Sequence, residues 1–404
     1  MSEWKEYRLG DLCYKVCSGG TPKSTCSSYY EGGTIPWLNT KEINYNRIFE
    51  TESHITEDGL NHSSAKWIDS NAVVVAMYGA TAGRVAIAKV PMTTNQACCN
   101  LMIDSSKADY NFIYYYLSNS YKYLLSMANG AAQQNLNAQI IKDLFISLPS
   151  LDEQRSIASI LSSLDSKIEN NRKICANLEA QAQALFKHWF IDFAPFKDGK
   201  FVESELGMIP EGWRVGTLSC IGDIIGGATP SKSVESNYCQ DGIHWLTPKD
   251  LSKNCLKFTS RGETDITLEG YTSCSAKIMP RGSVLFSSRA PIGYLTIAKN
   301  EICTNQGFKS IVPRYAGTAY IYYLLKYNTK RIEKLASGTT FKEVSGSLMK
   351  SLPIIIPTKS YLIRFENSVK ELFDEQELLE SQISHLSTLR DTLLPKLMSG
   401  EIKV

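Results

Sequence analysis

The sequence predicts an α+β protein with an internal tandem duplication, in which two globular α+β domains are joined by two long antiparallel coiled-coil helices. Three observations lead to this prediction. Short motifs recur at a spacing of 208 residues, the difference between positions 229 and 21. Within each copy, short apolar runs typical of strands precede a helical segment, and a heptad pattern follows. The chain has 404 residues, more than the roughly 250 to 300 at which a single core stops growing.

Matching segments run along both copies in the same order. Thr21-Pro22 recurs as Thr229-Pro230, Trp37-Leu38 as Trp245-Leu246, and "ITEDGLNHSSAK" as "ITLEGYTSCSAK". Two copies are too few for a solenoid, which needs at least three repeats. The predicted divisions are a first globular domain (head 1, 1–149), a first long helix (150–193), a linker (194–212), a second globular domain (head 2, 213–357), and a second long helix with the C-terminal tail (358–404).

The globular copies begin with strands and continue into helices. "AVVVAMY" and "SVLFSS" are predicted strands, each followed by a glycine-containing loop and a second strand. Tyrosine-rich helical segments follow at 112–128 and 319–336, and we expect their tyrosines to lie in the core and at its rim. Asn137 and Ser345 stand at equivalent positions before short apolar runs, where both residue types are good helix N-caps.

A heptad pattern follows each head. Apolar residues recur in steps of four and three from Ile157 to Trp189 and from Phe365 to Leu397, broken in the second copy by Arg390. Asn171 and Gln376 are single polar seam residues of the kind that fixes register. The residues predicted to form the seam or to contact protein partners are Leu161, Leu164, Ile168, Leu178, Leu185, Trp189, Phe190, Phe193, Leu372, Leu379, Ile383, Leu386 and Leu393.

The stretch "SGGTPKST" at 18–25 looks like a phosphate loop, but it lacks a glycine directly before the lysine. Its copy, "GGATPSKS" at 226–233, keeps the Gly-x-Thr-Pro turn and moves the lysine from Lys23 to the position of Lys232. A lysine that binds phosphates in catalysis has a fixed place relative to the turn. We therefore expect a repeated structural turn rather than a nucleotide site.

Composition favours an ordinary globular protein without a metal or disulfide framework. Apolar residues make up 43% and charged residues 21% of the chain, with a formal net charge of +2. The 11 cysteines contain no C-x-x-C pair and the 5 histidines show no metal-ligand spacing, so no metal site and no bound cofactor are expected. No apolar run has the length of a membrane span, and we expect a cytoplasmic protein. Catalytic motifs of methyltransferases, hydrolases and dinucleotide enzymes are missing, so a non-enzyme is expected.

Two similar but non-identical heads suit the reading of two different half-sites on one polymer, most naturally double-stranded DNA. The loops "YGATAG" and "SRAPIG" differ between the copies while their flanking glycines agree, as base reading requires. Asn95-Gln96 and Asn305-Gln306 recur identically, which favours structural hydrogen bonds over adenine contacts. The residues expected to contact DNA are Lys23, Lys41, Tyr78, Thr81, Arg84, Gln133, Gln134, Lys232, Lys249, Ser288, Arg289, Tyr294 and Lys342.

Over its whole length the sequence resembles the specificity subunits of Type I restriction-modification systems. The resemblance is carried by the two Gly-x-Thr-Pro turns, "GATAGRVAIA", "NGAAQQNLN", "LDEQRSIASILSSLDSKIENNRK", "FKHWFIDFAPFKDGKFVESELGMIPEGW" and "LRDTLLPKLMSGEIKV". It implies two target recognition domains, each reading one half of a split DNA sequence, and helices that act as a ruler. It also implies a non-catalytic subunit that binds two modification subunits and two restriction subunits, with S-adenosylmethionine, ATP and Mg²⁺ on those partners.

Two alternatives belong to other classes. A coiled-coil scaffold that joins two proteins would share the helices but bind no DNA, so a salt-dependent DNA shift distinguishes it. A nucleotide-binding enzyme would require Lys23 for a tight ATP signal.

Overall fold

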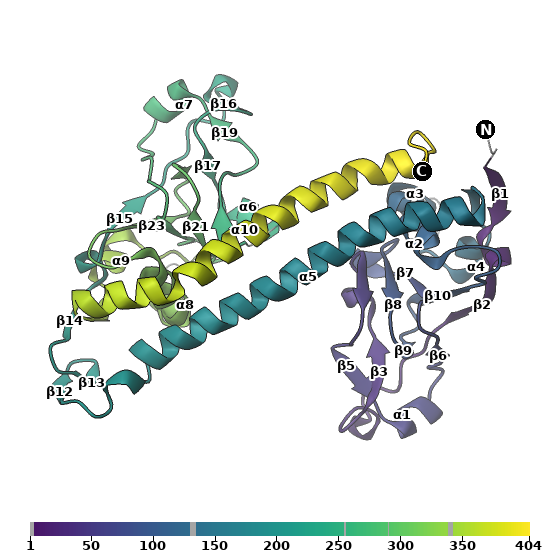
Figure 1. Ribbon diagram of the computed structural model, residues 1–404, viewed down its shortest axis with the longest axis horizontal. Coiled ribbons are helices and arrows are strands. Elements are labelled where there is room, and N and C mark those ends of the chain that lie inside the picture. The colour runs from purple at the N-terminus through teal and green to yellow at the C-terminus, as the bar shows by residue number, and fades with distance from the viewer. Residues whose placement is uncertain (1–3, 130–134, 254–255, 290, 338–341) are drawn as a thin grey trace. The chain divides into compact units, whose positions relative to one another are not determined.

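The computed structural model describes residues 4–129, 135–253, 256–289, 291–337 and 342–404, and contacts divide it into two compact units. Unit 1 comprises Met1–Glu169 and His385–Val404, and unit 2 comprises Asn170–Ser384. Each unit therefore holds one head together with part of each long helix. Figure 1 follows the elements by colour from β1 to α10.

Head 1 contains a five-stranded sheet of order β2-β10-β7-β8-β4 and a four-stranded sheet of order β5-β3-β9-β6. A two-stranded pair, β1 with β11, joins the beginning of the head to its end. The strands are β1 (Lys5–Arg8), β2 (Cys13–Ser18), β3 (Ile35–Leu38), β4 (Asn46–Ile48), β5 (Ser53–Ile55), β6 (Trp67–Ile68), β7 (Val73–Ala76), β8 (Val85–Ala88), β9 (Met92–Thr94), β10 (Cys98–Ile103) and β11 (Phe145–Leu148). The helices are α1 (Glu57–Asn61), α2 (Tyr110–Asn119), α3 (Tyr121–Asn129) and α4 (Ala138–Lys142).

Head 2 repeats this plan with the sheet order β15-β23-β20-β21-β18 and the pair β14 with β24. The four-stranded sheet of head 1 corresponds here to two separate pairs, β16-β19 and β17-β22. The strands are β14 (Arg214–Thr217), β15 (Gly222–Gly226), β16 (Tyr238–Cys239), β17 (Trp245–Leu246), β18 (Phe258–Thr259), β19 (Asp265–Ile266), β20 (Val284–Phe286), β21 (Leu295–Ala298), β22 (Cys303–Thr304), β23 (Lys309–Pro313) and β24 (Pro353–Ile356). The helices are α6 (Pro248–Lys253), α7 (Leu268–Thr272), α8 (Thr318–Leu335) and α9 (Gly346–Ser351).

The two long helices are α5 (Leu151–Phe190) and α10 (Lys359–Met398), each of 40 residues. Within unit 2 they run antiparallel, because Asn171 donates to Gln382 at 3.1 Å while the rings of Phe186 and Phe365 lie 6.0 Å apart. The predicted seam positions are all buried or half-buried, whereas the side chains between them are mostly exposed. The segment after α5 forms a hairpin of β12 (Phe201–Ser204) and β13 (Gly207–Pro210). The predicted α+β duplication with long antiparallel helices is confirmed.

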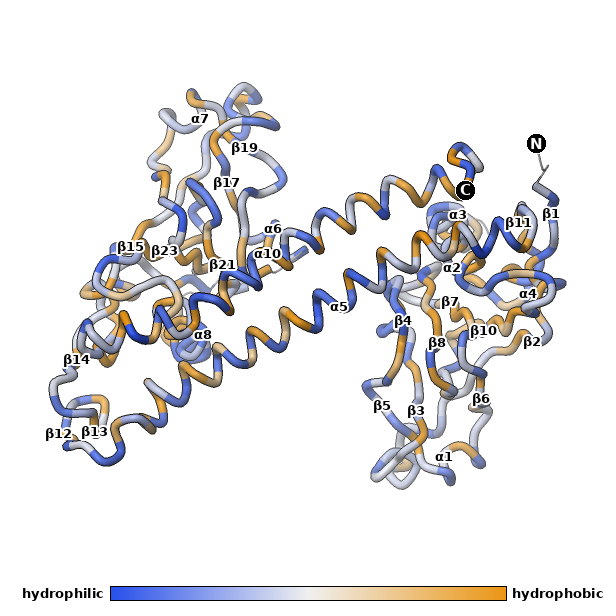
Figure 2. Tube along the Cα trace, viewed as in Figure 1, coloured by the Kyte–Doolittle hydropathy of each residue, from blue (hydrophilic) through white to orange (hydrophobic). Residues whose placement is uncertain are grey.

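The long helices complete the cores of the heads and do not form a domain of their own. In unit 1, Ile157 and Leu161 of α5 and Leu397 of α10 belong to the same buried cluster as strands β7, β8 and β10. The colouring in Figure 2 shows these strands as predominantly hydrophobic. Because each helix contributes apolar side chains to both units, contacts divide the chain within the helices and not at their ends.

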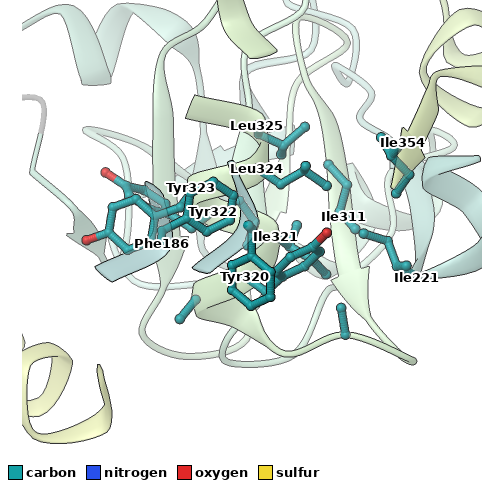
Figure 3. Packing of buried hydrophobic residues seen from close by; sticks show 14 of the residues in the cluster. Phe186, Ile221, Ile311, Tyr320, Ile321, Tyr322, Tyr323, Leu324, Leu325 and Ile354 are labelled. Atoms are coloured by element: carbon teal, nitrogen blue, oxygen red, sulfur yellow. The ribbon is translucent and has the colours of Figure 1, made fainter. Parts of the chain in front are cut away.

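One aromatic residue of the predicted seam and partner set, Phe190, lies in the core of unit 2. It is 5% exposed, and Phe186 of the same helix is 2% exposed. Figure 3 shows Phe186 against the tyrosines of α8, with ring centroids 5.8 Å from Tyr320 and from Tyr323. Phe190 also packs against Phe365 of the other long helix, with ring centroids 5.0 Å apart, which fits a place in the seam. Helical periodicity identifies an apolar face but not what covers it, so a partner contact at Phe190 stays a prediction.

The predicted tyrosine cores and helix caps are confirmed. Tyr114, Tyr115, Tyr322 and Tyr323 are buried. Each cap side chain accepts a hydrogen bond from the third residue of its helix, at 2.8 Å in head 1 and 3.1 Å in head 2. In unit 1 the tyrosine-rich segment is divided at Ser120 into α2 and α3, whereas in unit 2 it is the single helix α8.

The cysteines of the described residues are free thiols. Burial raises the pKa of Cys13, Cys99 and Cys303 to about 12, so these thiols are protonated at neutral pH. Within the described ranges, His, Cys, Asp and Glu side chains form no cluster of three or more that could hold a metal ion. No helix in this part of the chain combines the length and apolarity that a membrane span requires.

Candidate nucleic-acid interface

The Gly-x-Thr-Pro turns are fixed by matching hydrogen bonds in the two heads. The indole Nε1 of Trp37 donates to the carbonyl of Gly20 at 2.9 Å, and Trp245 donates to Ala228 at 3.1 Å. A tyrosine hydroxyl donates to the carbonyl of each turn proline, at 2.6 Å in head 1 and 2.7 Å in head 2. The repeated tryptophan therefore stabilises the repeated turn in both heads.

Glycine is required at the start of each turn by the close approach of another backbone. A Cβ on Gly19 would lie 2.0 Å from the carbonyl oxygen of Thr94, and one on Gly227 would lie 2.0 Å from that of Asn305. After the turn of head 1 the chain forms only a 3₁₀ helix, Ser27–Tyr29, and not the α-helix whose amides hold phosphates in a phosphate loop. These contacts account for the glycine-rich turn without a nucleotide.

The repeated Asn-Gln pairs make structural hydrogen bonds, as predicted. The side-chain oxygen of Asn95 accepts from the backbone N–H of Ala97 at 3.1 Å, and that of Asn305 accepts from Gly307 at 2.9 Å. The hydroxyls of Thr21 and Thr229 donate to the amide oxygens of Gln96 and Gln306. The side-chain amide oxygens thus accept hydrogen bonds from within their own head. The amide nitrogens remain as donors.

Head 2 has a concavity of about 580 Å³ beside its Gly-x-Thr-Pro turn. It brings together Lys232 and Lys249, both predicted DNA contacts, with the amides of Asn305 and Gln306. The rest of its lining is Thr229, Tyr238, Trp245, Thr247, Pro248, Asp250, Glu263 and Thr264. Two exposed ammonium groups beside amide and hydroxyl groups can bind phosphate oxygens and polar base edges.

The equivalent lysines of head 1 have different surroundings. Lys23 is exposed, and Lys41 forms an ion pair with Glu52 at 2.6 Å. The hydrogen bond with Glu52 raises the pKa of Lys41. Lys249 is the head 2 counterpart of Lys41, and it forms no ion pair with the described residues. The sequence did not predict Glu52 and Glu263 as neighbours of these lysines.

Three of the remaining predicted residues of head 1 lie in the β7–β8 loop. Tyr78 is 38% exposed, Thr81 is half-buried, and Arg84 donates to the side chain of Asn44 at 2.9 Å. Gln133 and Gln134 lie outside the described residues.

In head 2 the equivalent loop differs from expectation at one position. Ser288 is fully buried and its hydroxyl donates to the carbonyl of Gly307 at 3.2 Å, so its prediction as a surface contact is wrong. Arg289 is 46% exposed at its side chain and pairs with Glu343 at 3.0 Å. Tyr294 is half-buried against an apolar cluster, and Lys342 is exposed.

A buried polar cluster that the sequence analysis missed connects head 2 to the long helices. The Lys257 ammonium donates to Glu179 of α5 at 2.8 Å, to the Tyr323 hydroxyl at 2.9 Å and to Gln376 of α10 at 3.2 Å. Burial lowers the pKa of Lys257 to about 8, although Glu179 opposes the shift. Burial would raise the pKa of Glu179, but Lys257 and Lys326 together lower it. The polar seam residue Gln376 was the only signal for this cluster.

Comparison with known proteins identifies the family. The family model described as "Type I restriction modification DNA specificity domain" matches residues 1–180 and 210–361. The chain belongs to this family of specificity domains. It is 31% identical to the Type I restriction enzyme MjaIX specificity subunit of Methanocaldococcus jannaschii, over all of this chain and 94% of that protein. It is 24% identical to the HindI specificity subunit of Haemophilus influenzae, over the full length of both.

A solved structure of the same family has the same fold. The crystal structure of the Type I restriction-modification S subunit from M. genitalium matches with a TM-score of 0.64 and 19% identity. The match covers 98% of this chain and 96% of that one. The two segments matched by the Type I specificity family model contain the described elements of both heads, and each begins before the strand that opens its head.

Proposed function

We propose that this chain is the DNA-recognition subunit of a Type I restriction-modification complex and that each head reads one half of a bipartite target. The observation that carries the proposal is the duplication itself. Both heads hold the same turn with the same tryptophan and tyrosine bonds, while the polar side chains around that turn differ. A shared scaffold with different surface groups suits two readers of different sequences.

The long helices are proposed to set the distance between the half-sites and to dock two modification subunits. Because Phe186 and Phe190 are core residues, the docking surface has to come from side chains that point outward. Apolar residues of this kind on the two helices are Ile174 (37% exposed), Ile363 (50%), Leu378 (53%) and Leu389 (39%). These four side chains are the candidates for that docking surface.

The chemistry is proposed to belong to the partners. Two modification subunits would supply methyl transfer with S-adenosylmethionine, and two restriction subunits would use ATP and Mg²⁺ for cleavage, in the cytoplasm. The contribution of this chain is then to bind double-stranded DNA and to hold the partners on it.

A head exchange tests the bipartite proposal. Residues 1–149 are replaced by the corresponding head of a relative with a different target, and the methylated motif of a host that carries the complex is determined by methylation-sensitive sequencing. We expect one half of the motif to change and the other to remain. A change in both halves contradicts independent reading. A chain that gives no salt-dependent DNA shift supports the alternative of a coiled-coil scaffold.

A matched heptad insertion tests the spacing proposal. One heptad is added to each helix, between Asn171 and Cys175 and between Leu379 and Ile383, which keeps the seam in phase. Seven residues lengthen a helix by roughly 10 Å, or about three base pairs. Any retained motif should have unchanged halves and a longer gap, with weaker binding because about three pairs also rotate the groove. The original gap at full efficiency contradicts the proposal.

A further inference from the structure

Each head contains one lysine and one glutamate that correspond to a lysine and a glutamate of the other head. These residues are Lys41 and Glu52 in head 1 and Lys249 and Glu263 in head 2. Lys41 and Lys249 follow the repeated Trp-Leu pair at the same distance. Glu52 and Glu263 are also equivalent, because each backbone N–H donates to the first-turn acidic residue after that lysine. Glu52 donates to Glu42 at 2.9 Å, and Glu263 donates to Asp250 at 3.2 Å.

The side chains of these two glutamates nevertheless have different partners. In head 1, Glu52 pairs with Lys41 at 2.6 Å. In head 2, Glu263 pairs with Lys253, the last residue of α6, and leaves Lys249 beside the concavity. The residue of head 1 that corresponds to Lys253 is Tyr45, which carries no charge at neutral pH. Lys253 therefore gives Glu263 a cation that head 1 lacks at the corresponding position. The segment from the lysine to the glutamate is also three residues longer in head 2, 14 positions (249 to 263) against 11 (41 to 52).

Pairing decides how strongly a lysine attracts an anion. An ammonium held by a carboxylate has its charge compensated and must break that pair before it binds a phosphate. Among the described residues, Lys249 has no carboxylate partner. It shares the concavity with Lys232, so two positive charges face a space that Asp250 and Glu263 also line. The carboxylates of Asp250 and Glu263 have partners of their own, the hydroxyl of Thr247 and the ammonium of Lys253. The site has hydroxyl and amide groups beside them, the usual donors to backbone phosphates.

We propose that Lys232 and Lys249 of head 2 bind the phosphate backbone of DNA, and that Lys253 is a positioning residue that keeps Lys249 available by holding Glu263. In head 1 the counterpart of Lys249, Lys41, is paired with Glu52, so the two heads contribute unequally to backbone binding. The inference rests on the proposed DNA-recognition function and specifies which head supplies more of the electrostatic affinity.

The test uses the full chain and a random-sequence duplex of about 30 base pairs, because phosphate contacts do not depend on sequence. Fluorescence anisotropy gives the dissociation constant over a range of NaCl concentrations. We expect Lys249→Ala to weaken binding about three- to tenfold and to reduce the salt slope by about 0.9, the loss of one phosphate contact. Lys41→Ala should change the dissociation constant less than about twofold. Lys350→Ala removes an exposed charge of head 2 outside the concavity and is the control.

Second-site variants show whether Lys253 acts by holding Glu263 or only through its own positive charge. Lys253→Ala should weaken binding because Glu263 becomes free to pair with Lys249, and adding Glu263→Gln should restore it. Glu52→Gln should strengthen binding and increase the slope by about 0.9, because it frees Lys41. Circular dichroism checks that each variant is folded.

The outcomes distinguish this inference from the function on which it rests. Equal effects of Lys249→Ala and Lys41→Ala, or a Lys253→Ala defect that Glu263→Gln does not relieve, overturn the inference while DNA binding stands. No salt-dependent binding by the unmodified chain overturns both.

Discussion

Lys257 and Glu179 form a buried ion pair of 2.8 Å that joins the edge strand of one head to a long helix. The lysine side chain is 3% exposed and the glutamate side chain 19%. The backbone N–H groups of Lys257 and Phe258 also donate to Glu380 of α10, at 3.3 and 3.0 Å. Strand β18 is therefore held by both helices within unit 2, through side-chain and backbone bonds together.

Lys257→Met should lower the free energy of unfolding by about 2 to 4 kcal/mol, because the Tyr323 hydroxyl, Gln376 and Glu179 each lose a buried partner. Glu179 keeps its pair with Lys326, which limits the loss. The double variant Lys257→Met/Glu179→Leu should recover much of the stability, since it removes both buried charges. Urea unfolding gives the free energies of unfolding of the unmodified chain, both single variants and the double variant. A double variant as unstable as the sum of the two single variants contradicts coupling between these groups.

Because the pKa of Lys257 is lowered on folding, the difference in unfolding free energy between the unmodified chain and Lys257→Met should depend on pH. With a pKa of about 8 in the folded chain against 10.5 for an ordinary lysine, the unfolded state binds more protons between these values. Stability conferred by this residue therefore rises with pH from about 8 to 10.5, by up to about 3 kcal/mol. The measurement is the difference in unfolding free energy between the unmodified chain and Lys257→Met across that range. Lys330→Met, which removes an exposed amine on α8, should show no such trend.

Gly227→Ala should destabilise the chain by about 3 kcal/mol or more, because its Cβ would lie 2.0 Å from the carbonyl oxygen of Asn305 and 2.3 Å from that of Thr304. The adjacent Gly226 is a matched control, since a Cβ there meets no atom within 4 Å. Gly226→Ala should stay within about 1 kcal/mol of the unmodified chain. Thermal unfolding compares the two. Similar melting temperatures would mean that the turn can move away from the strand at little cost.

Phe190→Ala should cost about 3 to 5 kcal/mol, because the ring is buried between Tyr320, Trp213 and Phe365. Tyr327→Ala in the same unit should cost less than about 1 kcal/mol, since Tyr327 is 58% exposed. Chemical unfolding of both variants tests the assignment of Phe190 to the core. A Phe190→Ala variant as stable as the unmodified chain would mean that this ring contributes little to the core of unit 2.

Two glutamates at equivalent positions of the long helices each bind an arginine of their own unit. Arg47 contacts Glu169 at 2.8 and 2.9 Å, and Arg281 contacts Glu377 at 3.0 and 2.6 Å. Arg47 is 17% exposed at its side chain whereas Arg281 is 62% exposed. Glu169→Ala should therefore cost about 1 to 2 kcal/mol and Glu377→Ala less than about 1. Equal losses, measured at the same salt concentration, would mean that exposure does not decide the strength of these pairs.

The architecture was predictable because it follows from repetition and periodicity. The spacing of 208 residues established the duplication, and the four-three rhythm placed the helices within a few residues of α5 and α10. The caps at Asn137 and Ser345 followed from side-chain chemistry that acts over three residues. The structural use of Asn95 and Asn305 was predictable for a similar reason, since identical residues at both copies indicate a shared local bond.

By itself the sequence determined that the chain is an internal duplication and which faces of its helices are apolar. Only the tertiary structure decided what covers those faces and which charges meet. Phe190, expected in the seam or at a partner, packs against Tyr320 in the core of unit 2. Ser288, expected at the DNA, is buried and donates to the carbonyl of Gly307. Lys41 and Lys249 look alike in sequence, yet one is paired and the other faces a concavity. The physical reason is range: caps and heptads depend on neighbours within a few residues, whereas a long charged side chain takes its partner from whichever segment the fold brings beside it.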